Sequence, residues 1–127
     1  MRTTLDICIA WCWGDWFLLE GFYKVRFQVN DAVGRSVMYA HGGSMLGGNS
    51  AFAHYGTYTS ANGRWRGEIL NQEHSPAKNE NPIFGGREVG IGFSGTCDEQ
   101  GALLEATALA GKRSLRLTAV LKLMRPA

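Results

Sequence analysis

The sequence predicts an all-β protein, a small up-and-down antiparallel β-barrel of about eight strands. Short segments of alternating apolar and polar residues recur from Gly21 onward, which is typical of half-buried strands. Seventeen glycines and only three prolines suit tight turns and disfavour a helix bundle. Closing the sheet, with the last strand beside the first, removes two exposed edges, and a two-sheet sandwich is the competing architecture.

The first part of the barrel is predicted to contain five strands. The alternation is strict in residues 21–29, whose aromatic and valine side chains share one face. The dipeptide Asn62-Gly63 is the strongest short hairpin signal in the chain. The expected strands are residues 21–29, 35–41, 44–46, 52–59 and 64–71, separated by breaks at residues 30–34, 41–43, 47–49 and 60–63.

The remaining strands follow the longest expected loop, residues 73–86, which is polar and contains two prolines. Residues 88–96 and 102–109 are predicted to be extended, with a turn at 98–101 between them. Residues 114–123 show the clearest alternation in the chain. No segment has a convincing helical period.

Length, charge and cysteine content limit the possible classes of protein. The 127 residues suit one domain with a modest core, and a net charge of +2 does not by itself indicate a nucleic-acid surface. The three cysteines Cys8, Cys12 and Cys97 form no disulfide framework and indicate a reducing, cytoplasmic setting. Zinc sites usually show two tight ligand pairs, so we expect no metal and no cofactor.

Residues 1–19 do not share the pattern of residues 20–127, which we predict to be a single barrel domain. The segment carries Asp6 and Asp15, is too short for a membrane helix, and has no cleavage signal. Three interpretations stay open: an element packed on the barrel, an apolar arm that docks a partner, or an extension from a start codon assigned too far upstream. We favour the last, which predicts unchanged melting after deletion of residues 1–19.

Four short segments carry a resemblance to a known family. They are GFYKVRFQ at residues 21–28, GGNSAF at 47–52, GTY at 56–58 and FGG at 84–86. From Gly21 to the C-terminus the chain resembles the GrlR-type negative regulators of type III secretion and their uncharacterised bacterial relatives. The resemblance implies a lipocalin-like barrel that dimerises and sequesters a transcriptional activator without catalysing a reaction.

The same resemblance implies a site for that activator on an exposed loop between strands, where the best-known member carries an acidic run. The matching loop here, residues 59–63, is neutral. The nearest acidic pair, Asp98-Glu99, lies in a different expected turn. The resemblance therefore supports the barrel more strongly than this particular binding loop.

The candidate acids and bases lie mainly on polar strand faces or at turns, where solvated residues belong. An inward histidine such as His54 is more often a satisfied interior residue than a catalyst. Ser50 and Ser94 lack a G-x-S-x-G context, and the paired glycines precede no phosphate-loop lysine. We therefore predict no enzyme activity from the candidate side chains, which are His41, His54, His74, Glu68, Glu88 and Glu105.

One set of apolar and aromatic residues is the candidate lining of the barrel interior. These side chains either fill the barrel or surround a small apolar ligand, and a one-residue change of register would turn them outward. Small residues at 90, 92, 106 and 108 either leave space inside or let the strands coil. The candidate ligand-binding residues are Tyr23, Val25, Phe27, Phe52, Tyr58, Trp65, Ile91 and Phe93.

The leading hypothesis is a cytoplasmic, homodimeric, non-enzymatic regulator that binds another protein, with the loop 73–87 as the first place to look for recognition. The alternative is a carrier or sensor of a small apolar ligand. We expect no membrane partner and no direct binding of nucleic acid. The basic cluster near the C-terminus is interpreted as solvated barrel exterior; it comprises Lys112, Arg113, Arg116, Lys122 and Arg125.

Overall fold

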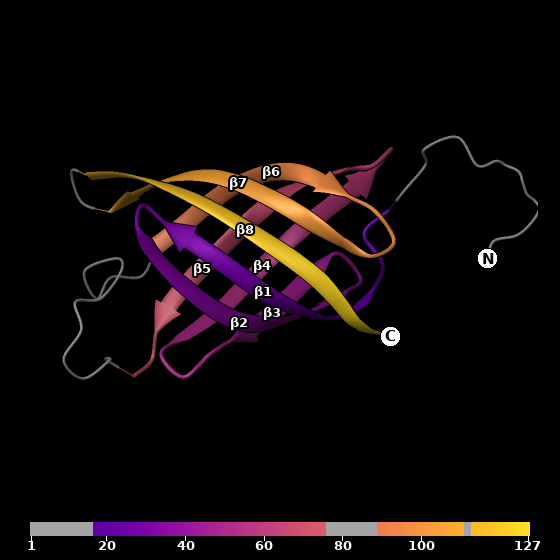
Figure 1. Ribbon diagram of the computed structural model, residues 1–127, viewed down its shortest axis with the longest axis horizontal. Coiled ribbons are helices and arrows are strands. Elements are labelled where there is room, and N and C mark those ends of the chain that lie inside the picture. Colours follow the sequence, from indigo (N-terminus) through magenta and orange to yellow (C-terminus); the bar gives the residue numbers. More distant parts are fainter. Residues whose placement is uncertain (1–16, 76–88, 111–112) are drawn as a thin grey trace, which may run out of the picture.

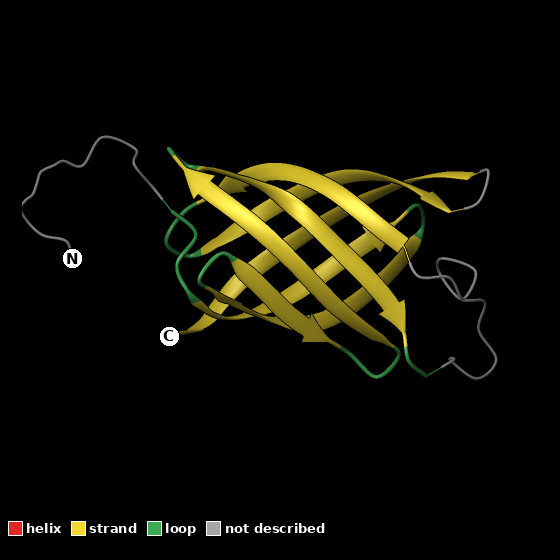
Figure 2. Ribbon diagram, turned by 180° about the vertical axis from the view of Figure 1, so that it is seen from behind, coloured by secondary structure: helices red, strands yellow, loops and turns green. Residues whose placement is uncertain are grey.

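The computed structural model describes residues 17–75, 89–110 and 113–127, which form a closed barrel of eight antiparallel strands (Figure 1). Each strand pairs with its neighbours in sequence, and β8 pairs with β1, so the up-and-down barrel is confirmed over the sandwich. The described residues contain no helix (Figure 2). The strands are β1 (Gly21–Val29), β2 (Ala32–His41), β3 (Ser44–Gly48), β4 (Phe52–Ala61), β5 (Arg64–Glu73), β6 (Val89–Cys97), β7 (Gly101–Ala110) and β8 (Arg113–Pro126).

The predicted hairpin at Asn62-Gly63 joins β4 to β5. Asn62 and Gly63 take φ angles of 56° and 75°, which is the type I′ geometry that matches the twist of the strands it connects. Gly42 and Gly43, with φ angles of 60° and 80°, make the same kind of turn between β2 and β3. Both turns are short because glycine and asparagine tolerate the left-handed conformation.

Two expected breaks are wrong. The turn predicted at residues 30–34 is only Asn30-Asp31, since Asn30 takes a φ of 52° and Val29 already pairs with Ala32. Of the break predicted at residues 47–49, Gly47 and Gly48 are instead the last two residues of β3, paired to β2 and β4. A Cβ on Gly47 would lie 2.1 Å from the carbonyl oxygen of Val37, so this glycine permits a close approach of two strands.

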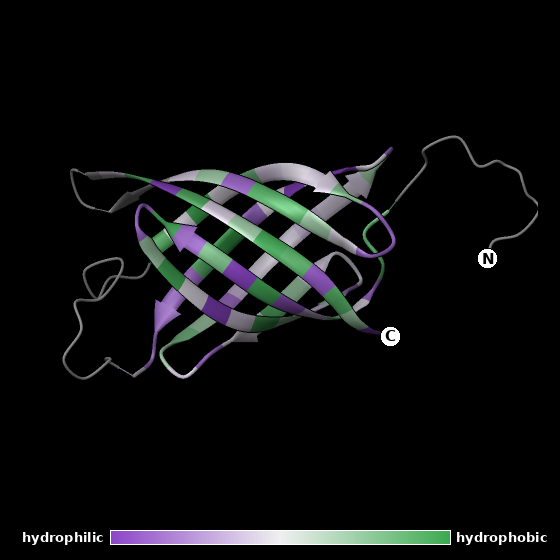
Figure 3. Ribbon diagram, viewed as in Figure 1, coloured by the Kyte–Doolittle hydropathy of each residue, from purple (hydrophilic) through white to green (hydrophobic). Residues whose placement is uncertain are grey.

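The core lies inside the barrel, because every strand turns alternate side chains inward. Figure 3 shows this alternation as successive hydrophobic and hydrophilic bands along the strands. Of the two interpretations left open for Gly90 and Gly92, space inside the barrel is excluded, since both lie on the exposed side of β6 and a Cβ at either would meet no atom. Ala106 is half-buried against the core, and the side chain at 108 lies outside the described residues.

The residues just before β1 lie against one end of the barrel. Leu18 is only 4% exposed and belongs to the core, and its N–H donates to Ser60 Oγ at 3.1 Å. Leu19 accepts a hydrogen bond from the hydroxyl of Tyr23. Residues 1–16 lie outside the described part, but this packing argues against unchanged melting after deletion of residues 1–19.

The backbone ladders between adjacent strands differ in length around the barrel. The ladder between β6 and β7 joins Phe93–Cys97 to Ala102–Ala106. No ladder pair joins Gly92 to Thr107, although both residues are described. Beyond this point, among the described residues, β6 has ladder pairs only with β5, and β7 has ladder pairs only with β8.

Candidate functional site

The structure brings all eight predicted lining residues into the interior. They come from β1, β4, β5 and β6, and each is at most 9% exposed. The ring centroid of Trp65 lies 4.5 Å from that of Phe93 and 6.2 Å from that of Tyr58. Their burial follows from the register of the ladders, which the alternation alone left undetermined.

The space between these side chains is small. The interior cavity has a volume of about 40 Å³. Cavities that bind a molecule as small as benzene measure about 150 Å³, whereas a single water needs about 10–15 Å³. The interior side chains therefore fill the barrel, and what they leave has the size of a few water molecules.

Three buried polar side chains also line this cavity: Ser36, His54 and Asn71. His54 Nδ1 is hydrogen bonded to Asn71 Oδ1, and desolvation by burial lowers the pKa of His54 against a smaller opposing effect of that bond. Ser36 Oγ is buried without a hydrogen-bond partner among the described residues. Because Ser36 Oγ makes no hydrogen bond among the described residues, it is not hydrogen bonded to the imidazole of His54 as a nucleophile is to its general base.

The phenol of Tyr23 is fully buried at the other end of the interior. Burial, with smaller contributions from Tyr58, Cys97 and Asp98, raises the pKa of this phenol. Burial likewise raises the pKa of the free thiol of Cys97. Both groups are therefore protonated at neutral pH, and a thiol in that form is a poor nucleophile.

The other candidate acids and bases do not converge. His41 is exposed and stacks on Tyr39, with ring centroids 5.9 Å apart. His74, also exposed, is hydrogen bonded to Ser75 Oγ and to the carbonyl of Asn49. Within the described residues, no three His, Cys, Asp or Glu side chains gather as a metal site would require.

Two of the glutamates lie on the outer wall, near the place where β6 and β7 separate. Glu68 and Glu105 border a shallow open hollow of about 1,020 Å³. Glu105 pairs with Arg116 at 3.6 Å, and both side chains are at least 70% exposed. An ion pair this exposed contributes little to the free energy of unfolding. Glu88, another candidate acid, lies outside the described residues.

The outer wall carries a feature that depends on the register of five strands. Successive ladder partners form one row of outward apolar side chains from β1 to β5, which we call the apolar row. The first two rings lie 4.9 Å apart, and four members are between 37% and 56% exposed. The apolar row comprises Phe22, Tyr39, Leu46, Tyr55 and Leu70.

Four exposed basic side chains lie beside the apolar row, and we call them the basic quartet. Lys24 on β1 is the ladder partner of Lys122 on β8, and Arg26 on β1 is the partner of Arg35 on β2. The alternation of residues 21–29 puts Lys24 and Arg26 on the face opposite the aromatic side chains, but only the register adds Lys122 and Arg35. Sequence reasoning therefore missed this cluster.

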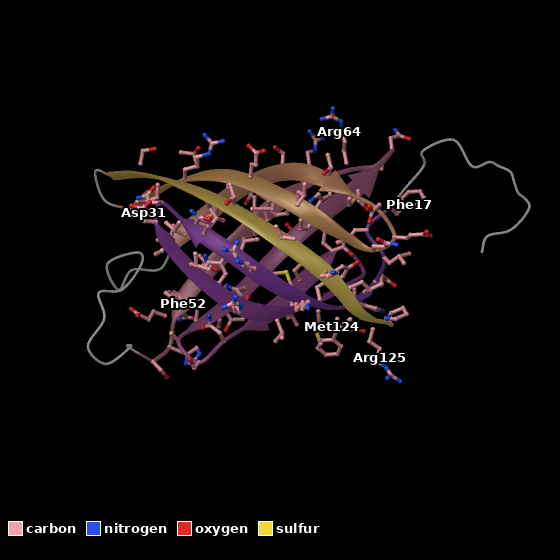
Figure 4. The ribbon with its side chains drawn as sticks, viewed as in Figure 1. Phe17, Asp31, Phe52, Arg64, Met124 and Arg125 are labelled. Atoms are coloured by element: carbon pink, nitrogen blue, oxygen red, sulfur yellow. The ribbon has the colours of Figure 1, made fainter. Side chains whose placement is uncertain are left out.

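The described members of the C-terminal basic cluster have different neighbours. Lys122 joins the basic quartet, whereas Arg116 pairs with Glu105 farther along β8. Figure 4 shows Met124 and Arg125 projecting outward near the end of β8. Lys112 and the side chain of residue 113 lie outside the described part of the chain. Most of the loop 73–87, the expected recognition loop, also lies outside it.

The comparisons with known proteins assign no family. No protein-family model matches the chain, and no curated protein matches it. In the described part of the chain, no helix has the length and apolar character needed to cross a bilayer. The resemblance drawn from short sequence segments therefore has no support beyond the barrel itself.

Proposed function

We propose that this protein is a non-enzymatic, protein-binding barrel. The observation that carries the proposal is the apolar row, which is continuous across β1–β5 and lies on the outer wall. Scattered exposed apolar residues are normal, but contiguous ones mark surfaces that bind other molecules.

The apolar row does not serve the core of this barrel. The interior is filled by the opposite faces of the same strands, where Tyr23, Met38 and Met45 are at most 5% exposed. Outward neighbours within the row stabilise the sheet only by cross-strand packing. A partner that covers part of the row removes apolar area from water, which favours association.

The sequence resemblance supports a more specific form of the proposal. In that form the protein is a homodimeric negative regulator of type III secretion gene expression that sequesters a transcriptional activator. The loop 59–63 carries no acidic residue, so recognition here uses the apolar row and its surroundings instead of an acidic loop. This form predicts that the partner is an activator and that two copies of the barrel associate.

The carrier of a small apolar ligand has weaker support. A cavity of about 40 Å³ does not hold even a benzene-sized molecule without expansion of the core. Buried side chains at interior packing density resist such expansion. The lining residues Tyr23, Phe27 and Trp65 therefore act mainly as core.

Affinity purification of the tagged protein from its own host tests the proposal. We expect the wild type to retain a protein that the variant Phe22→Ser/Leu46→Ser loses. The matched control is Leu103→Ser/Val120→Ser, which alters an exposed cross-strand pair on β7 and β8 outside the row. Retention of the same protein by both variants, or of none by the wild type, would contradict the proposal.

Native mass spectrometry of the same samples separates the remaining possibilities. A captured transcriptional activator supports the specific regulator. A mass of two barrels alone identifies the partner as a second copy, whereas a small apolar mass on a single barrel supports the carrier.

A further inference from the structure

We infer that the outer face of β8, β1 and β2 binds an acidic amphipathic protein segment, in which apolar side chains are flanked by carboxylates. The inference rests on the proposed function and adds the chemistry of the partner. It uses the basic quartet together with the nearest end of the apolar row, Phe22 and Tyr39.

The basic quartet places like charges directly opposite one another on adjacent strands. Lys24 faces Lys122 across the β1–β8 ladder, and Arg26 faces Arg35 across the β1–β2 ladder. Side chains at such positions have Cβ atoms about 4.5–5.5 Å apart, and like charges there destabilise a sheet. Two such pairs on three neighbouring strands create a local positive field although the net charge is only +2.

Nothing in the described part of the chain neutralises these four side chains. All four are exposed, and the ion pair found among the described residues, Arg116 with Glu105, does not involve them. Their charges are therefore available to carboxylates supplied by another molecule. Removal of the mutual repulsion would then add to the direct attraction.

The apolar and basic groups form one continuous face. On β1, Phe22, Lys24 and Arg26 point outward in succession, each about 7 Å from the next. On β8, Lys122 is the ladder partner of Lys24 and Arg125 that of Phe22, and Met124, which is 56% exposed, lies at the bulge between them. A partner that covers the apolar end therefore brings its flanking residues over the cations.

A protein segment fits this face better than nucleic acid or a bilayer. The rings of Phe22 and Tyr39 pack on each other, and the neighbouring Val37 and Met124 are not stacking platforms for bases. The wall of a closed eight-stranded barrel is convex, so few of its cations would reach a flat membrane at once. A short peptide follows such a curved surface.

Fluorescence polarisation with synthetic peptides tests the inference. The probe is a labelled peptide of about 16 residues in which leucines are flanked by glutamates, long enough in any conformation to cross the three strands β8, β1 and β2. We expect it to bind the wild type, and the same peptide with lysine for glutamate or serine for leucine to bind at least about tenfold more weakly. Binding should weaken as salt is added.

Charge reversal on the protein completes the test. Lys24→Glu/Arg26→Glu should weaken binding of the acidic peptide about tenfold, whereas the control Arg64→Glu/Arg66→Glu on β5 should change it less than about twofold. The first variant should also fold at least as stably as the wild type, because each reversal replaces a like-charge pair by an opposite-charge pair.

Several outcomes would overturn the inference. These are absence of peptide binding, an equal effect of the two charge variants, or preferential binding of single-stranded DNA or of vesicles containing phosphatidylglycerol. A host protein that is lost with Phe22→Ser/Leu46→Ser but retained by Lys24→Glu/Arg26→Glu would leave the proposed function standing and overturn this inference alone.

Discussion

His54 on β4 and Asn71 on β5 are ladder partners, and their side chains share a hydrogen bond inside the barrel. The ring of Phe27 meets His54 edge-on, with the two planes at 84°. Among the residues that line the interior cavity, His54 is the one titratable group. Its protonation would therefore place an uncompensated charge in the core.

This arrangement predicts that the protein loses stability in mild acid. Burial lowers the pKa of His54 below its ordinary value of 6.5. As the pH falls below about 6.5, the unfolded chain binds more protons than the folded one, so the free energy of unfolding decreases, by at most about 1.4 kcal/mol per pH unit. Urea unfolding between pH 7.5 and 5 should show a smaller decrease for His54→Gln. His41→Gln, at an exposed position, should behave as the wild type.

Substitution of two glycines on adjacent strands should have opposite outcomes. A Cβ on Gly67 would lie 1.9 Å from the carbonyl oxygen of Thr57, whereas a Cβ on Gly92 would meet no atom. Gly67→Ala should therefore lower the free energy of unfolding by about 1–3 kcal/mol, and Gly92→Ala should change it by less than about 0.5 kcal/mol. Equal effects in thermal melts would contradict the close approach of β4 and β5 at this point.

Leu18 should contribute to stability although it precedes the first strand. Its side chain is buried, so Leu18→Ala should lower the free energy of unfolding by about 2 kcal/mol or more. The control is Phe17→Ala, at a position that is 56% exposed, which should have little effect. Deletion of residues 1–19 should destabilise the barrel at least as much as Leu18→Ala, as measured by urea unfolding. An unchanged midpoint would restore the interpretation of an unneeded extension.

Trp65 should be the most sensitive aromatic position. It is 2% exposed, and its Nε1–H donates to the carbonyl of Leu103 at 2.8 Å. Trp65→Phe keeps most of the ring but loses the donor, which should remove about 1–3 kcal/mol of stability. Trp65→Ala should remove about 3–5 kcal/mol, because it also leaves a cavity. A chemical denaturation series that gives Trp65→Phe the same stability as the wild type would contradict the role of this hydrogen bond.

The strands were predictable because alternation and turn chemistry are local. Residues 21–29 were predicted as one strand, and β1 has the same bounds. The errors occur where a glycine serves a long-range purpose, as at Gly47, or where one left-handed residue shortens a turn, as at Asn30. Sequence reasoning treats both as breaks, since it does not see the neighbouring strand.

The candidate interior was also predictable as a set, but its volume was not. Alternation in residues 64–71 puts Trp65 and Ile69 on one face, and the same period points Asn71 inward. Whether the facing side chains close the space depends on how all eight strands meet. The apolar row and the basic quartet need the register of several ladders, which no local pattern contains.

The short ladder between β6 and β7 has a consequence for the local unfolding of the barrel. In the described part of the chain, hydrogen bonds join β6 to β7 only between Phe93–Cys97 and Ala102–Ala106. The neighbouring ladder between β7 and β8 is longer and includes all of Gly101–Ala110. Local opening should therefore start between Gly92 and Thr107, ahead of global unfolding. Solvent deuterium would enter the interior there first and reach the buried hydroxyl of Ser36 while the rest of the sheet stays closed.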